Sequence, residues 1–147
     1  MKLASLFIAF TALCFSTLAA AQATAVGLWQ SFDNNTGAPR AEIRITESKG
    51  VLTGRIERNL LPQTATTAQT CEKCTDDRKG AALIGMELVR NAKASSEAGV
   101  WEGGEIMDPD EGKTYRLRLQ LLEDGKKMQV RGYVGPFFKN RVWVRVG

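Results

Sequence analysis

Residues 101–135 read WEGGEIMDPDEGKTYRLRLQLLEDGKKMQVRGYVG, and this stretch decides the fold. Apolar and polar side chains alternate strictly over residues 114–121 and again over residues 127–134. This alternation predicts two β-strands that each carry one apolar face, and a third strand-like run begins before them at Trp101. The segments Asp108–Gly112 and Glu123–Gly125 contain the Asp, Pro and Gly residues that are typical of tight turns. The stretch therefore predicts an antiparallel meander, which the rest of the chain should extend.

Similar strand-like runs lie on both sides of this meander, at residues 26–32, 41–47, 51–58, 83–90 and 141–146. The run 83–90 fits a strand or a short helix, and the strand is the favoured interpretation. The total is about eight strands, a number that can close into a small barrel whose interior holds side chains or one small ligand. We therefore predict an all-β fold in which one antiparallel meander closes into a barrel over residues 26–147. Alternation alone does not tell which face of each strand is inside.

The first 25 residues have the order of a secretory signal peptide. Lys2 is basic, residues 3–18 are mainly apolar, and small residues follow at 19–21 and again at 23–25. We predict cleavage near residue 21 or 25 and export to a bacterial periplasm or to the medium. A membrane anchor is the less favoured alternative because the apolar run is short, so we expect no stable membrane insertion after cleavage.

Composition argues against several classes of function. The net charge is +4 and the basic residues are scattered, whereas a nucleic-acid surface needs them clustered. The chain has no histidine, which removes the commonest general base and metal ligand. Asp108, Asp110 and Glu111 lack the spacing of a calcium loop and fit a hairpin turn. We predict no catalytic residues, no cofactor, no metal ion and no nucleic-acid partner.

Cys71 and Cys74 are the only cysteines after residue 25. In an oxidising compartment such a pair most simply forms a local disulfide, which is the prediction. A redox-active pair would require a helix start beneath it, and a zinc site would require two further ligands, so both are less favoured. The pair lies in residues 59–82, a long stretch without strand pattern, and long loops are often functional.

Two observations point to a known architecture. Gly27–Trp29 is a G-x-W sequence at the start of the first strand, as in lipocalin-type barrels, where an arginine from a late strand covers the tryptophan; Arg131, Arg141 or Arg145 would supply it. The chain also resembles the bacterial secreted family known as domain of unknown function 2147, through Gly27–Trp29, Thr36–Gly37, Gly50–Ile56, Cys71–Cys74, Gly85–Met86, Trp101–Gly104, Asp108–Pro109, Gly112–Tyr115, Val130–Tyr133, Gly135 and Trp143–Arg145. The resemblance implies a small lipocalin-like β-barrel outside the cytoplasm, and it implies no activity.

The leading functional hypothesis is a barrel without enzymatic activity that binds a small apolar or amphipathic molecule inside. Its expected ligand-binding residues are Trp29, Met86, Tyr115, Arg131 and Tyr133, the last two only if their face of the strand turns inward. The alternative is a filled barrel that acts through its surface as an envelope-stress or protein-interaction module. The unusually apolar turn 136–140 would then mark a rim or a contact surface.

Overall fold

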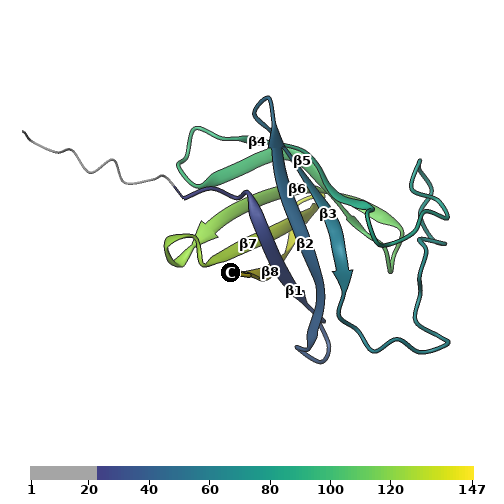
Figure 1. Cartoon of the computed structure of the whole chain (residues 1–147). Coiled ribbons are helices and arrows are strands. Elements are labelled where there is room, and N and C mark those ends of the chain that lie inside the picture. The colour runs from purple at the N-terminus through teal and green to yellow at the C-terminus, as the bar shows by residue number, and fades with distance from the viewer. Residues whose placement is uncertain (1–22) are drawn as a thin grey trace, which may run out of the picture.

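The computed structural model describes residues 23–147. The predicted signal peptide falls almost entirely on residues 1–22, outside the described residues. The strands are β1 (Gly27–Phe32), β2 (Pro39–Ser48), β3 (Val51–Asn59), β4 (Glu87–Ala94), β5 (Val100–Asp108), β6 (Lys113–Leu122), β7 (Lys127–Val134) and β8 (Phe137–Arg145). Each strand pairs antiparallel with the next, and β8 returns to β1 to close a barrel (Figure 1). The predicted eight-stranded antiparallel barrel is confirmed.

One strand begins later than expected, and one predicted turn is confirmed. Residues 83–86 form a turn, so the run predicted as 83–90 becomes strand only at Glu87. The connection between β6 and β7 contains a single 3-10 turn, η1 (Glu123–Gly125), in which Gly125 has a φ of +83°. Glycine takes such a backbone angle without steric cost, which is why the turn ends there.

Strand register decides which face of β8 is inside. Directly paired residues of neighbouring antiparallel strands share a face, and Met128 pairs with Trp143 while Val130 pairs with Arg141. Met128 and Val130 are buried, so Trp143 is also inside, with 5% of its surface exposed. Val142 then points outward and is 42% exposed. The valines of the last strand thus form its outer face, and its bulkiest and most basic residues form its inner face.

One end of the barrel is closed by Trp29 and Arg145. Trp29 is fully buried, and the Arg145 guanidinium carbon lies 4.2 Å from the centre of its ring. Arg145 also donates hydrogen bonds to the carbonyls of Gly125 (2.7 Å), Val26 (2.9 Å) and Thr24. Of the three arginines considered from the sequence, Arg145 is therefore the one that covers the tryptophan. Gly27 is required beside it, since a Cβ there would lie 2.6 Å from the guanidinium.

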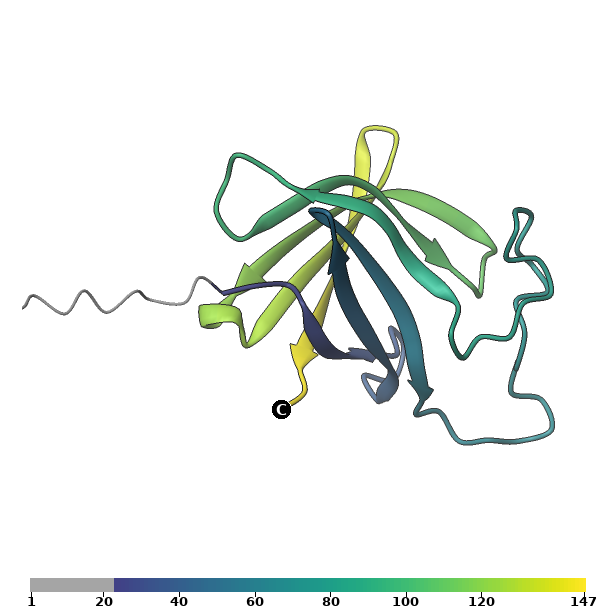
Figure 2. The ribbon, with the colours of Figure 1, turned by 45° about the horizontal axis from the view of Figure 1, so that its top comes forward.

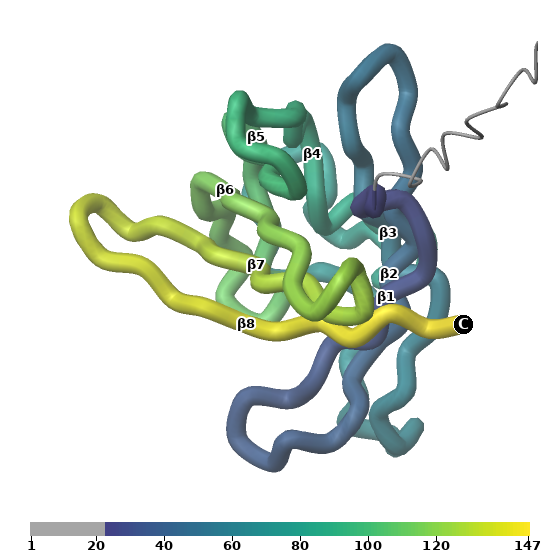
Figure 3. Tube along the Cα trace, turned by 90° about the vertical axis from the view of Figure 1, so that its left-hand side faces the viewer, coloured from purple at the N-terminus to yellow at the C-terminus, as the bar shows by residue number. Residues whose placement is uncertain are grey.

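The seam between the first and the last strand is short. Strands β1 and β8 pair only at Trp29 with Arg145 and at Gln30 with Val144, and one further hydrogen bond runs from the Val146 amide to the Leu28 carbonyl. The rest of β8 pairs with β7 alone. The β7–β8 hairpin, yellow in Figure 3, consequently projects away from the barrel body. The barrel is therefore open beyond Gln30 and Val144, where pairing between β1 and β8 stops.

The residues just before β1 belong to the fold. Ala25 is fully buried and its carbonyl accepts a 2.8 Å hydrogen bond from the Trp29 indole, while Thr24 accepts from Arg145. A chain that begins at Val26 lacks both acceptors, each worth about 1 kcal/mol. We expect it to melt roughly 4–8 °C below a chain that begins at Gln22.

Scanning fluorimetry of the two chains measures this difference, with a chain beginning at Ala23 as the control that should match Gln22. The same contacts favour the predicted cleavage near Ala21 over that near Ala25, and N-terminal sequencing of the mature chain tests this prediction. Equal melting temperatures for all three chains would contradict the assignment of residues 24 and 25 to the fold.

Candidate functional site

A cavity of about 240 Å³ opens above the seam, between the end of β1 and the β7–β8 hairpin. Its floor is apolar and is formed by Leu88, Met107, Val130 and Trp143, which are all at least nine-tenths buried. Its walls come from the neighbouring inward positions, Ile106, Tyr115, Gly132 and Val134. The smallest wall residue is Gly132, where a Cβ would meet Tyr115 Cβ at 3.3 Å. A glycine at this point leaves space that any other residue would reduce.

One side of the cavity mouth carries two carboxylates, Asp33 and Asp110, that are linked by Arg40. Asp33 accepts hydrogen bonds from the amides of Thr36 (2.9 Å) and Asn35 (3.0 Å) and from the Thr36 hydroxyl. These bonds, with the nearby Arg40 charge, lower the pKa of Asp33. Arg40 lies 3.5 Å from Asp33 and donates a 2.6 Å hydrogen bond to Asp110. Arg40 thus links the β1–β2 turn to the β5–β6 turn across the mouth.

The other side carries two cations from the inner face of β8. Lys139 and Arg141 line the mouth, and in residues 23–147 neither lies within ion-pair distance of a carboxylate. Their charges reach Glu111, whose pKa is lowered first by a hydrogen bond from the Tyr115 hydroxyl and then by these cations and Lys113. The same bond raises the pKa of Tyr115 to about 12, so its hydroxyl remains protonated. Two cations therefore face an apolar cavity without a protein counter-ion in contact.

The long loop of residues 60–86 runs outside the barrel and connects β3 to β4 (Figure 2). Cys71 and Cys74 form the predicted disulfide, with Cα atoms 5.4 Å apart, and both are buried. The Cys74 sulfur lies 3.7 Å from the sulfur of Met107 on the cavity floor, and the Lys73 ammonium donates a 2.9 Å hydrogen bond to the Asp110 carbonyl. The disulfide segment therefore supports the turn that forms one edge of the mouth.

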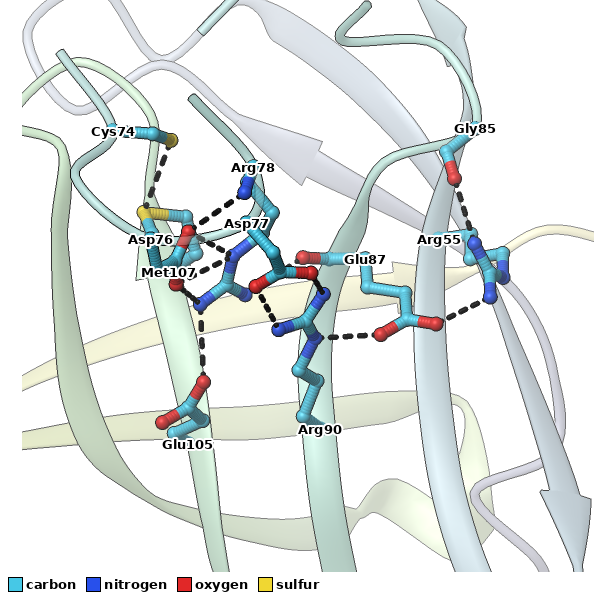
Figure 4. A network of polar contacts seen from close by, with 10 residues as sticks. All are labelled: Arg55, Cys74, Asp76, Asp77, Arg78, Gly85, Glu87, Arg90, Glu105 and Met107. Atoms are coloured by element: carbon cyan, nitrogen blue, oxygen red, sulfur yellow. Dashed lines mark hydrogen bonds and ion pairs between the residues drawn. The ribbon is translucent and has the colours of Figure 1, made fainter. Parts of the chain in front are cut away.

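A buried arginine fastens this loop to the sheet (Figure 4). Arg78 is only 2% exposed, and its guanidinium donates to Asp76 in the loop, to the Glu87 carbonyl on β4 (3.0 Å) and to Glu105 on β5 (3.0 Å). These bonds from Arg78 lower the pKa of Asp76 to about 2. A buried cation needs such complete pairing. We therefore interpret Arg78 and its partners as an anchor that holds the loop on the sheet. It takes no part in the cavity.

A second pair of contacts in the same view continues the anchor. Arg90 on β4 makes two 2.8 Å hydrogen bonds to the Asp77 carboxylate and one of 2.6 Å to Glu87. The bonds to Asp77 raise the pKa of Arg90 and lower that of Asp77. Glu87 also accepts from Arg55 on β3. The network spans three strands and the loop, which fixes the loop relative to the barrel wall.

Comparison with known proteins shows the family and the fold of the chain. The profile of a bacterial family described as uncharacterized and conserved, domain of unknown function 2147, matches residues 27–145. The chain belongs to this family. No curated protein matches it. A solved structure, protein HP1028 from the human pathogen Helicobacter pylori, which belongs to the lipocalin family, superposes with a TM-score of 0.68 at 14% identity, over 83% of this chain and 82% of that one. At that identity the likeness shows the fold, a lipocalin-like barrel.

The residues predicted to bind a ligand are not all together. Tyr115 lies in the cavity wall. Trp29 closes the opposite end of the barrel, and Met86 is buried just before β4, where its carbonyl accepts from the Ile56 amide. Arg131 and Tyr133 alternate with the inward Val130 and Gly132, so their face of β7 turns outward. They were expected to bind a ligand only if this face turned inward. The structure thus leaves Tyr115 at the cavity and the other four elsewhere.

Sequence reasoning missed Lys139 and Arg141. The alternation of the last strand places them with Trp143, but its valines look like the apolar core face. The turn Gly135–Pro136 could have predicted their orientation. A two-residue loop at this turn pairs Val134 with Phe137, and the same register then pairs Gly132 with Lys139. Counting outward from that turn puts both cations on the face of the buried Val130.

Neither a metal site nor a membrane span emerges from the described residues. Within residues 23–147 no three Cys, Asp or Glu side chains converge as metal ligands would. In that same part of the chain no helix is long and apolar enough to cross a membrane.

Gly112, in the β5–β6 turn, tests how the disulfide segment supports the mouth. Its φ is +70°, and a Cβ there would overlap the carbonyl of Lys73. We expect Gly112→Ala to lower the free energy of unfolding by about 1–3 kcal/mol more than Gly37→Ala does, because overpacking adds to backbone strain. Gly37 is a matched control, with a φ of +72° and nothing within 4 Å. Urea unfolding measures both, and equal losses would contradict the contact.

The Asp76–Arg78 anchor predicts a dependence on pH. The pKa of Asp76 is about 2 in the folded protein against 3.8 ordinarily, so its stabilising contribution is complete above pH 3.8 and is lost as the pH falls towards 2. We expect urea-unfolding free energies to decline over that window in the parent protein. Asp76→Asn should be less stable at neutral pH and should decline less steeply. Parallel curves for the two proteins would rule out the anchor as the source.

Proposed function

We propose that this chain is an exported protein without enzymatic activity that binds a small amphipathic anion of the fatty-acid type. The proposal rests on the apolar cavity faced at its mouth by Lys139 and Arg141, two cations that no carboxylate of residues 23–147 contacts. Ligand pockets generally combine apolar walls with a few polar groups that fix the orientation of the guest. The apolar part of the guest would lie over Val130 and Trp143, and its head group would lie between the two cations.

Size and charge narrow the class of ligand. The cavity of about 240 Å³ lies just below the range of about 300–1,000 Å³ common for small-molecule pockets, which favours a short or medium chain. Glu111 carries one negative charge within electrostatic reach of Lys139, Arg141 and Lys113, so these four groups have a net charge of +2. An anionic head group such as a carboxylate complements this positive charge. Hydrogen bonds from both cations to the head group would be charge-assisted.

A separate observation supports the alternative function, a barrel that acts through its surface. Phe137 and Phe138 are 75% and 51% exposed at the end of the β7–β8 hairpin, outside the cavity. Exposed aromatic groups of this kind mark contact surfaces. A barrel that acts through its surface, as an envelope-stress or protein-interaction module, would use them and would need no guest inside. Ligand binding by the cavity separates the two functions.

Titration with a fluorescent medium-chain fatty acid tests the head-group contacts. We expect Lys139→Gln and Arg141→Gln each to raise the Kd about tenfold or more, because a hydrogen bond to a charged group contributes about 1.5–3 kcal/mol. Lys93→Gln is the control, since Lys93 is an exposed cation on β4 that does not line the cavity. An unchanged Kd in both mouth variants would remove these cations from the site.

Gly132→Leu tests whether the guest lies inside. The new side chain would start 3.3 Å from Tyr115 Cβ and 3.8 Å from the Ile106 methyl carbon Cγ2 and would extend into the cavity. We expect probe binding to be lost while the far-ultraviolet circular dichroism stays that of a β-barrel. Mass spectrometry of extracts from protein purified from its own envelope should also find a bound amphiphile. If no amphiphile copurifies and the parent protein binds no probe, the surface-acting barrel becomes the better account.

A further inference from the structure

The tip of the β7–β8 hairpin exposes a cluster of large apolar side chains. Val134, Phe137 and Phe138 are 48%, 75% and 51% exposed, on either side of the Gly135–Pro136 turn. The hairpin stands away from the barrel body, so its tip is convex (Figure 3). Phenylalanine is among the residues most often buried in proteins. Two adjacent exposed phenylalanines on a projecting tip indicate that something outside residues 23–147 covers them.

The charges of the hairpin itself are of one sign. From Lys126 to Gly147 the sequence contains no Asp or Glu. Arg131 lies over the Phe138 ring, 4.1 Å from its centre, and Arg116 of β6 lies 4.4 Å from the centre of the Tyr133 ring. Cation–π contacts of this kind hold the guanidinium groups beside the aromatic side chains. The apolar tip is thus bordered by cations on its own strands and on the next one.

The pairing of the arginines singles out this region. In residues 23–147, seven arginines form ion pairs with carboxylates: Arg40, Arg44, Arg55, Arg58, Arg78, Arg90 and Arg118. Arg145 donates to three backbone carbonyls at the closed end. The remaining three, Arg116, Arg131 and Arg141, have no carboxylate partner in that part of the chain and lie on β6 and the hairpin. The unpaired arginines are concentrated where the apolar side chains are exposed.

We propose that the hairpin tip docks on an anionic lipid membrane. Phe137, Phe138 and Val134 enter the interface between head groups and acyl chains, and the cations contact lipid phosphates. Apolar side chains flanked by long basic ones match the gradient from hydrocarbon to head group. A convex tip needs no preformed groove in a lipid surface, whereas a protein partner would have to supply one. Charge complementarity selects anionic over zwitterionic lipid.

Docking would place the cavity at the membrane. Val134, Lys139 and Arg141 belong to the hairpin and also line the cavity mouth, so the mouth would face the lipid surface when the tip is inserted. An amphiphile could then pass between the bilayer and the cavity without crossing open water. This consequence rests on the proposed ligand binding, while the docking itself does not.

Cosedimentation of residues 22–147 with vesicles tests the docking. We expect binding to vesicles of equal parts phosphatidylglycerol and phosphatidylcholine, little binding to phosphatidylcholine alone, and loss of binding as sodium chloride rises from about 0.1 to about 0.5 M. The double variant Phe137→Ser/Phe138→Ser and the single variant Arg131→Gln should each weaken binding by about tenfold. Ile84→Ser and Lys93→Gln are the matched controls, since Ile84 is 50% exposed and Lys93 is an exposed cation, both away from the hairpin.

A second measurement reports insertion directly. Phe137→Trp should show a blue shift of tryptophan emission with the anionic vesicles and none with phosphatidylcholine. The double serine variant should keep its Kd for the fluorescent fatty acid in solution, because neither phenylalanine lines the cavity. Failure of docking is thereby separated from failure of ligand binding.

Three results would overturn the proposal. The first is absence of binding to anionic vesicles. The second is binding that neither lipid charge nor salt changes. The third is self-association in analytical ultracentrifugation that the double serine variant abolishes, which would assign the tip to an interface between copies of this chain.

Discussion

The contact between Arg145 and Trp29 joins the two ends of the chain and holds the barrel closed. The two residues are directly paired across the seam, and the guanidinium lies 4.2 Å from the ring centre while it donates to carbonyls of the β6–β7 connection and of the segment before β1. A seam of two residue pairs is weak as a ladder, so closure relies on this half-buried cation and the fully buried aromatic ring. Gly27 makes room for it, which gives the glycine of the G-x-W motif its physical role.

The short seam between β1 and β8 also leaves one end of the barrel open. Because pairing between β1 and β8 ends after Gln30, the upper part of β8 is free to follow β7 away from the barrel. The cavity lies in the space this creates, and its mouth is bordered by residues of the projecting hairpin. The loop of residues 60–86 acts in the opposite sense, since its disulfide and the buried Arg78 fix the far wall. The site thus has one rigid side and one side formed by a hairpin with few other contacts.

The pairing of charged side chains also differs between the loop side and the hairpin side of the site. On the rigid side, Arg40, Arg78 and Arg90 are each paired with carboxylates, which is how proteins stabilise buried or half-buried cations. On the hairpin side, Arg131 and Arg141 have no such partner in the described residues. Paired charges hold structure, and unpaired charges remain available to a ligand or a surface. The proposals of a bound anion and of an anionic membrane draw on this division.

The amino-acid sequence by itself determined the fold class, the strand count, the meander order, the disulfide between Cys71 and Cys74, and the family. These depend on local patterns: alternation, turn residues and spacing. Among the ligand-binding residues expected from sequence, only Tyr115 lies at the cavity. Alternation defines two faces without saying which is inside, so it left the inward face of β8 open.

Tertiary structure decided the site. Pairing with Val130 and Met128 turned Arg141 and Trp143 inward, and a seam of two pairs left the barrel open above them. Arg78 became buried because Glu105 and the Glu87 carbonyl, distant in sequence, converge on it. Such convergence depends on strand register and on loop docking. Both are set by the free energy of the whole barrel, and no single stretch of residues encodes them.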